Sequence, residues 1–154
     1  MRKRIKSVTL LVGVSAILFV TTAAASTPGL GKKAKDGDFT FVATDLRCNI
    51  MRVGRAYGAK PSGQYCAINI SVYNHSNTSQ FIDVSAQIAF DKKRRQYPAD
   101  TSADIYSANS IDLKSVNPGI TVHGTLYFDM PKRDKPSYFM FHDSSFSGGV
   151  RVNA

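Results

Sequence analysis

The sequence contains no tryptophan and no glutamate, and it has only two cysteines and three histidines. All 11 of its acidic residues are aspartates. Aspartate favours turns and caps whereas glutamate favours helix interiors, so this composition is unfavourable to a mostly helical protein. No stretch repeats apolar residues at helical spacing over three turns. These absences point away from a helical fold and leave few side chains for metal or thiol chemistry.

Residues 1–25 have the layout of a secretory signal peptide. Basic residues precede an uncharged apolar run over 8–20, and small residues follow it. Ala23 and Ala25 satisfy the small-x-small rule, which predicts cleavage between Ala25 and Ser26. The alternative is a retained anchor, but the run of 13 residues is shorter than the roughly 20 that cross a bilayer. We therefore expect a secreted, extracellular protein that meets the membrane only during export.

The charge of the mature chain is smaller than that of the precursor. Four of the 20 Lys and Arg residues lie in the predicted signal peptide and none of the 11 acids do, which leaves 16 against 11, a net charge of +5. This modest excess suits attraction to anionic cell-envelope polymers or lipid, and it is too small to indicate nucleic acid. Another surface protein is a further possible partner.

The two cysteines, Cys48 and Cys66, most simply form one disulfide in a secreted chain. A closed loop of about 18 residues would stabilise the fold by roughly 3 kcal/mol. A reactive thiol pair or a metal site are the alternatives, but no other ligand lies near either cysteine in the sequence.

Alternation of apolar and polar residues dominates the rest of the chain and predicts strands. It is clearest over 65–73, 81–91 and 120–130, with shorter candidates at 39–44, 110–113, 137–142 and 149–152. In the second run the pattern places Ile82, Val84, Ala86, Ile88 and Phe90 on one buried face. Gly124 interrupts the inner row of the third run, which indicates a bulge or a close backbone approach.

Turn-forming segments separate these runs, so the chain is predicted to be all-β, with about seven antiparallel strands in two packed sheets. Residues 26–37 are rich in Gly, Pro and Lys and read as a flexible N-terminal arm. The folded domain is therefore expected to cover 38–154.

Several segments also resemble a known family, in the order GKKAKDGDFTFVATDLRC, GQYCAINISVYN, FDKKRRQYPAD, NPGITVHGTLYFDMP and FHDSSFSGGVRV. They are similar to a family of secreted bacterial domains of unknown function, grouped with the immunoprotective extracellular, immunoglobulin-like proteins that include a mycobacterial secreted antigen. The resemblance spans roughly 31–152 and implies an immunoglobulin-like β-sandwich and a Gram-positive source. The family offers no catalytic residues to carry over. This chain departs from it at Arg94, where relatives tend to have glycine.

The adjacent His142, Asp143 and Ser144 invite comparison with a Ser-His-Asp triad. Consecutive residues of a strand point to opposite faces, and no G-x-S-x-G motif is present, so we expect a strand end and a polar turn instead. Phe146 is then expected to cover an edge of the core. An extracytoplasmic hydrolase or metal-dependent enzyme that uses His142 and nearby acids is the alternative hypothesis.

Metal binding has no support in residue spacing. His75, His123 and His142 are not paired at ligand spacing, and Asp100 and Asp104 lack the rest of a calcium-loop motif, so a solvated loop is expected there. We predict no cofactor.

Lys92, Lys93, Arg94 and Arg95 form the densest cluster of charge. A solvated hairpin tip that discourages aggregation is one interpretation, and an electrostatic contact with an anionic surface is the other. The sequence as a whole predicts a secreted, non-enzymatic module that binds at the cell surface or in the medium.

Overall fold

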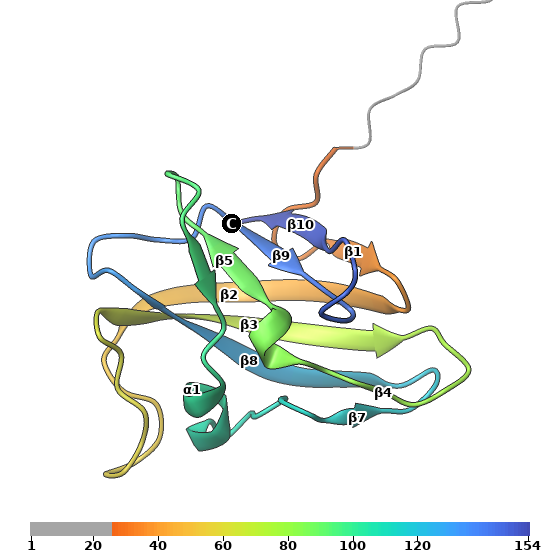
Figure 1. Cartoon of the computed structure of the whole chain (residues 1–154), viewed down its shortest axis with the longest axis horizontal. Coiled ribbons are helices and arrows are strands. Elements are labelled where there is room, and N and C mark those ends of the chain that lie inside the picture. Colours follow the sequence, from red (N-terminus) through yellow and green to blue (C-terminus); the bar gives the residue numbers. More distant parts are fainter. Residues whose placement is uncertain (1–25) are drawn as a thin grey trace, which may run out of the picture.

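Two long strands, β3 (Gln64–Asn74) and β8 (Thr121–Met130), are neighbours in the larger sheet of the computed structural model, which describes residues 26–154. They pair antiparallel from Gln64↔Met130 to Tyr73↔Thr121 without interruption. β2 (Phe39–Ile50) pairs with the other edge of β3, and β1 (Lys33–Asp36) pairs with β2. The sheet order is β1-β2-β3-β8 (Figure 1).

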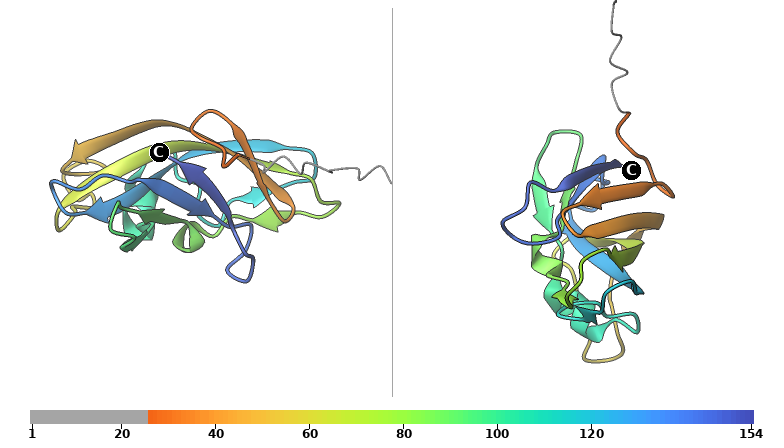
Figure 2. Two further views of the ribbon diagram at one scale, coloured as in Figure 1. Left: turned by 90° about the horizontal axis from the view of Figure 1, so that it is seen from above. Right: turned by 90° about the vertical axis from the view of Figure 1, so that its right-hand side faces the viewer.

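The second sheet contains four shorter strands in the order β10-β9-β5-β6. These are β10 (Val150–Asn153), β9 (Tyr138–Phe141), β5 (Ile88–Phe90) and β6 (Gln96–Pro98). The two sheets lie face to face in the side view (Figure 2). Phenylalanine rings fill the space between them: Phe41 stacks on Phe141 at 5.6 Å between ring centroids, and Phe128 lies 5.5 Å from Phe139. The prediction of an all-β, immunoglobulin-like sandwich is confirmed.

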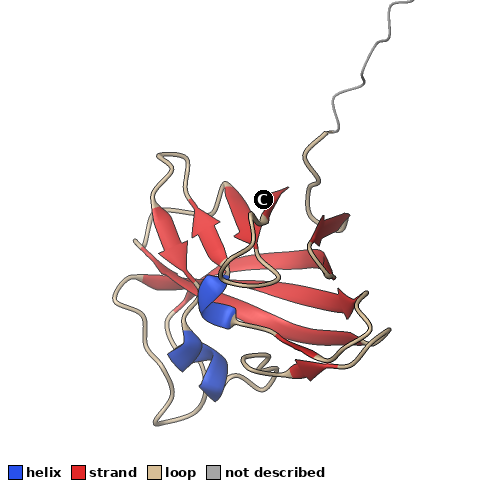
Figure 3. Cartoon of the chain, turned by 45° about the vertical axis from the view of Figure 1, so that its right-hand side comes forward, coloured by secondary structure: helices blue, strands red, loops and turns tan. Residues whose placement is uncertain are grey.

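Short elements close the lower side of the sandwich in Figure 1. β4 (Gln80–Phe81) and β7 (Ser115–Val116) form a two-stranded ribbon. A 3₁₀ turn (Val84–Ala86) and the helix α1 (Thr101–Tyr106) are the helical segments of the described chain (Figure 3). No helix within 26–154 is long and apolar enough to cross a membrane.

The alternation over 65–73 and 120–130 predicted its strands correctly. Cys66, Ile68, Ile70 and Val72 are all buried, as are Leu126, Phe128 and Met130. Gly124 lies against another segment, since a Cβ there would come within 2.5 Å of the Cβ of Ile111. The pairing of β8 with β3 runs through this position, so the glycine serves a close approach and not a bulge.

The prediction for 81–91 is wrong, because the chain does not stay extended. Asp83 caps a 3₁₀ turn by accepting a hydrogen bond from the Ala86 N–H, and this turn reverses the phase of the pattern. Gln87, Ala89 and Asp91 are buried after the turn, while Ile88 and Phe90 are only half-buried. Residues 110–113 likewise form no strand, and the nearby β7 begins at Ser115.

The predicted flexible arm over 26–37 is also wrong at its C-terminal end. β1 pairs with β2 from Lys33↔Val42 to Asp36↔Phe39, and Ala34 is buried in the core. Farther back, the Asn153 N–H donates to the Pro28 carbonyl. The only apolar residue of the short segment K-A-K-D is Ala34, which stands between two lysines. The composition of the segment therefore resembles that of a linker, although Ala34 is buried in the core. The predicted signal peptide and cleavage position lie outside the described residues.

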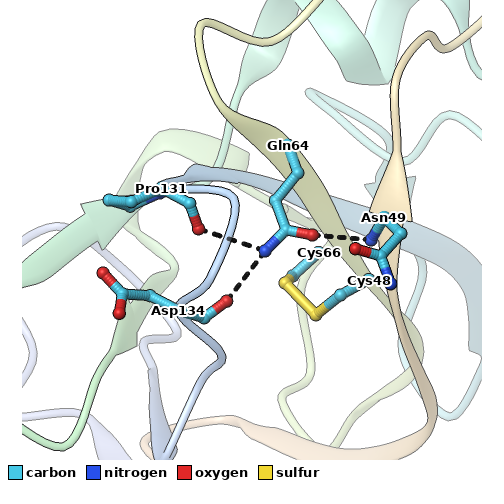
Figure 4. Close-up of a disulfide and its surroundings, with 6 residues drawn as sticks. All are labelled: Cys48, Asn49, Gln64, Cys66, Pro131 and Asp134. Atoms are coloured by element: carbon cyan, nitrogen blue, oxygen red, sulfur yellow. Dashed lines mark hydrogen bonds between the residues drawn. A yellow bond between two sulfur atoms is a disulfide. The ribbon is translucent and has the colours of Figure 1, made fainter.

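A disulfide joins Cys48 to Cys66, the pairing expected from the sequence (Figure 4). It links neighbouring strands of one sheet, whereas the disulfide of antibody domains joins two sheets. β2 contains two one-residue bulges here, between Thr44 and Arg47 and between Arg47 and Ile50. Asp45 and Asn49 occupy them with φ of 53° and 64°, a conformation that aspartate and asparagine tolerate better than most residues.

Candidate functional site

His142, Asp143 and Ser144 do not converge. The His142 backbone N–H donates to the side chain of buried Gln87, and the Asp143 carboxylate accepts from the Asp38 N–H. The Ser144 carbonyl accepts from the Ser147 N–H. The expectation that Phe146 covers an edge of the core is wrong, because its side chain is 97% exposed at the tip of the loop.

A different serine contacts the histidine, but the order of groups is wrong for nucleophilic catalysis. Ser147 Oγ lies 3.3 Å from His142 Nδ1 and donates to Asp36 Oδ2 at 2.5 Å. The serine therefore sits between the carboxylate and the imidazole, whereas a triad needs the imidazole in the middle. Asp36 Oδ2 also accepts from the Asp143 N–H, so the carboxylate ties the loop before β10 to the turn after β1. This cluster explains local structure.

The other histidines lie on the outer face of the larger sheet. His75 Nε2 is 2.7 Å from Thr40 Oγ1, and His123 Nδ1 is 2.8 Å from Ser71 Oγ. No group of three or more metal-binding side chains occurs within residues 26–154.

Asp100 and Asp104 belong to helix α1 and its cap, so the solvated loop expected there is wrong. Asp100 accepts from the Ala103 N–H as the N-cap and from the Tyr65 hydroxyl. Burial and the hydrogen bond to Asp100 raise the pKa of Tyr65. Asp104 is fully buried and accepts from the backbone of Ile111 and Asp112 and from Ser110 Oγ.

Lys92 to Arg95 do form a hairpin tip, between β5 and β6. Lys92, Lys93 and Arg94 are exposed, and Arg94 has φ of 62°, the left-handed conformation that glycine adopts most easily. The chain therefore keeps a cation at a position where a glycine would fit the backbone better.

Arg95 differs from its neighbours because it is paired. Its Nε donates to Asp91 Oδ2 at 2.6 Å, and its Nη2 donates to Asp134 Oδ2 at 2.5 Å. Burial works to raise the pKa of Asp91, but hydrogen bonds from Arg95, Lys93 and Tyr97 outweigh it and lower that pKa. The hydrogen bond to Asp91 in turn raises the pKa of Arg95. Arg95 thus fixes the hairpin against loop 131–136, and the two loops line a cavity of about 420 Å³.

Gln64, a residue that the sequence did not single out, fixes loop 131–136 from the adjoining end of β3 (Figure 4). It is 2% exposed. Its Nε2 donates to the carbonyls of Pro131 and Asp134, and its Oε1 accepts from the Asn49 N–H. One buried amide therefore joins the ends of β2 and β3 to loop 131–136.

Three loops, 51–63, 91–95 and 131–136, lie at this end of the sandwich, on the left-hand side of Figure 1. We name them the basic end. They carry ten Lys and Arg residues against two Asp, a net charge of +8. The other described residues carry six against nine, a net of −3. All of the excess positive charge of residues 26–154 is thus concentrated at one end of the sandwich. This concentration is not evident from the sequence, because the three loops are far apart in the chain.

The sequence matches the profile of a domain of unknown function, DUF4352, over residues 28–152. The chain belongs to the DUF4352 family. This match covers nearly all of the described residues and agrees with the family resemblance inferred from the sequence. No curated protein matches the chain.

Solved structures share the fold of this DUF4352 domain at low sequence identity. The secreted protein MPT63 of Mycobacterium tuberculosis is 16% identical with a TM-score of 0.65, over 86% of this chain and 100% of that one. The yjhA protein of Bacillus subtilis is 12% identical with a TM-score of 0.61, over 82% and 98%. A putative lipoprotein of the same organism, ycdA, is 13% identical with a TM-score of 0.54, over 78% of this chain and 38% of that one. At such identities the likeness establishes a β-sandwich and carries no residue-level function.

Proposed function

We propose that this protein is an extracytoplasmic, non-enzymatic binding module that attaches through its basic end to an anionic polymer of the cell envelope. The observation that carries the proposal is the charge separation, +8 on three loops at one end of the sandwich against −3 on the other described residues. Concentrated charge of one sign attracts a polyanion at long range and orients the domain as it approaches.

The chemistry of the loops favours a polymer over insertion into a bilayer. Lys92, Lys93 and Arg94 are exposed, and so are Lys132, Arg133 and Lys135. No large apolar side chain is exposed on loops 91–95 and 131–136, whereas loop 51–63 exposes Met51 and Tyr57. The first two loops therefore present cations without apolar side chains, and such a surface adsorbs to phosphate or carboxylate groups without entering the hydrocarbon region.

A location outside the cytoplasm has independent support. The arrangement of residues 1–25 is that of a signal peptide. Stable disulfides are typical of proteins that fold in oxidising compartments, and Cys48 and Cys66 form one here. One structural neighbour is a secreted protein and another is a putative lipoprotein.

The test is adsorption of the protein of residues 26–154 to purified cell-wall fragments that carry phosphate polymers, measured by sedimentation across a series of salt concentrations. Each cation near an anionic surface contributes about 1 kcal/mol. The triple variant K92Q/K93Q/R94Q should therefore bind about 100-fold more weakly at low salt. Adsorption of the unmodified protein should fall steeply as salt rises.

A matched control is K32Q/K33Q/K35Q, which removes the same charge from exposed positions at the start of the domain. Equal weakening in both variants would mean that only net charge matters, and the basic end would lose its assigned role. Anionic lipid vesicles form a second arm. Stronger adsorption to vesicles than to wall fragments would replace the polymer by the membrane surface.

A further inference from the structure

An arginine-lined cavity lies at one side of the basic end, where its loop 51–63 meets the end of β2 and the end of helix α1. Its volume is about 480 Å³. The side chains that matter are Arg47, Arg52, Arg55, Tyr106, Ser107 and Tyr127. No acidic residue lines it, and none of the three arginines takes part in an ion pair within the described chain.

The guanidinium groups have donors available for a ligand. Each guanidinium carries five N–H donors in a planar fork that matches the oxygens of a phosphate. Arg52 uses Nη1 to donate to the carbonyls of Arg55 and Ala56, which holds its head group against the loop. Its Nε and Nη2 have no hydrogen-bond partner among residues 26–154.

The cavity has a rigid base. The Val53 N–H donates to the Ala59 carbonyl at 2.9 Å, and the Gly58 N–H donates to the Arg55 carbonyl at 2.9 Å, so the loop is closed on itself. Val53 is buried in a small second core with Tyr65 and Ala103, which is separate from the main core between the sheets. This core anchors the loop and helix α1 side by side.

A glycine allows the loop to approach the helix closely. Gly54 has φ of +84°, and a Cβ there would lie 2.9 Å from the Cβ of Tyr106. Tyr106 and Tyr127 thereby reach the same cavity from different elements, and the Tyr127 hydroxyl lies 3.2 Å from Ser107 Oγ. The cavity thus combines uncompensated guanidinium groups with aromatic rings and hydroxyls.

We propose that this cavity binds a phosphate group carried on a sugar or polyol. The arginines would hold the phosphate oxygens by charge-assisted hydrogen bonds, and the tyrosine rings and Ser107 would contact the hydroxylated body. The inference deepens the proposed function, on which it rests: the exposed loops attract the polymer, and the cavity holds one phosphorylated unit of it.

The experiment is calorimetric titration of the protein of residues 26–154, in about 0.15 M salt, with glycerol 3-phosphate, glucose 1-phosphate, glucuronate and glucose as separate probes. At this ionic strength, charges more than about 8 Å apart are largely screened. The two phosphorylated probes should bind saturably, and glucose should not bind. The R47Q/R55Q variant, which keeps the loop-bracing Arg52, should lose about tenfold in affinity for each guanidinium removed.

The K92Q/K93Q/R94Q variant is the matched control and should bind the phosphorylated probes within about threefold of the unmodified protein, since its charges lie on another loop. An unchanged thermal midpoint of R47Q/R55Q excludes loss of folding as the cause. Absence of saturable binding, equal losses in both variants, or glucuronate binding as tightly as the phosphates would overturn the proposal. If K92Q/K93Q/R94Q retains wall adsorption while the probes still bind at the cavity, the proposed function fails and the phosphate site remains.

Discussion

The two ends of this sandwich treat charge in opposite ways. At the end opposite the basic loops, Asp36 and Asp143 accept hydrogen bonds from backbone N–H groups and from Ser147. Their carboxylates are thus engaged in holding two turns together. At the basic end, Arg95 alone among ten cations forms an ion pair within the described residues. The two aspartates at one end are thus structural, whereas the lysines and arginines without an ion pair at the other end are available to a ligand.

Each end also depends on one side chain that makes more than one hydrogen bond to a loop. Asp36 accepts from the Asp143 N–H and the Ser147 hydroxyl of the loop before β10, and Gln64 donates to two carbonyls of loop 131–136. The two differ in burial, because Gln64 is 2% exposed whereas Asp36 is half-buried. We therefore expect the free energy of unfolding to fall more when Gln64 is replaced than when Asp36 is replaced. Replacement of Gln64, but not of Asp36, should also disturb the binding surface.

The largest effect is expected from Gln64→Leu. The substitution keeps the approximate volume but leaves the Asp134 carbonyl and the Asn49 N–H without their partner. The Pro131 carbonyl keeps only its hydrogen bond from the Asp134 N–H. Unsatisfied buried groups cost about 1–3 kcal/mol each, so the free energy of unfolding should fall by about 3 kcal/mol or more. Denaturant unfolding measures it, and amide exchange should show the greatest loss of protection near loop 131–136.

Gln96→Leu is the control, because Gln96 is exposed and its side chain has no hydrogen-bond partner among the described residues. It should change stability by less than about 0.5 kcal/mol. If Gln64→Leu were equally mild, the three hydrogen bonds would not be what fixes the basic end.

A smaller loss is expected from Asp36→Ala at the opposite end. The Asp143 N–H and Ser147 Oγ would lose their acceptor, at a cost of about 2 kcal/mol in the free energy of unfolding. Adsorption to wall fragments should not weaken, because no cation of the basic end is touched. Asp38→Ala removes the same charge from the same turn, but the Asp38 carboxylate accepts no hydrogen bond within 26–154. A comparable loss in both variants would show that charge, not the hydrogen bonds, sets the stability of this end.

The fold was predictable where the chain stays regular over many residues. Strands β3 and β8 alternate for about ten residues, and most of their inner-face residues were assigned correctly. Ile120, expected on the inner face, is exposed, and Tyr65 and Ala67, expected on the outer face, are buried. The alternation over 81–91 was interrupted by the 3₁₀ turn at Val84–Ala86, which shifts the phase and cannot be seen in a pattern of residue types. Helix α1 has six residues, too few for a helical period to appear. β1 was missed because it contributes one buried side chain, Ala34.

The candidate site was predictable only in part, for a related reason. Lys92–Arg95 is a local cluster and could be recognised in sequence. Its association with loops 51–63 and 131–136 follows from strand pairings that join distant segments, namely β3 with β8 and β5 with β9. Arg47, Arg52 and Arg55 are spread among apolar and glycine residues, so their convergence on one cavity depends on the bulges of β2 and on the closed loop after it.

Arg94→Gly should separate stability from attraction at the basic end. Glycine adopts the left-handed φ of 62° without the steric cost that arginine bears, so the free energy of unfolding should rise by up to about 1 kcal/mol. Adsorption should weaken severalfold because one cation is lost. Arg94→Gln removes the charge but keeps the strained backbone, and should weaken adsorption equally without any gain in stability. A glycine variant no more stable than the glutamine variant would show that the turn bears no such strain.

The smallest effect is expected at acid pH, where protonation of Asp91 should weaken the hydrogen bonds that its carboxylate accepts from Lys93 and Arg95. Because hydrogen bonds lower the pKa of Asp91 below its ordinary 3.8, its carboxylate stabilises the hairpin at and above that pH, and this contribution is lost as the pH falls through the lowered value. Carbon-detected NMR titration should give Asp91 a midpoint below its ordinary value of 3.8. Amide exchange at Lys93 and Arg95, whose N–H groups donate to Asp91, should accelerate only below that midpoint. In Asp91→Asn the exchange should show no such step; a midpoint at or above 3.8 in the unmodified protein would mean that Arg95 does not hold the two loops through this carboxylate.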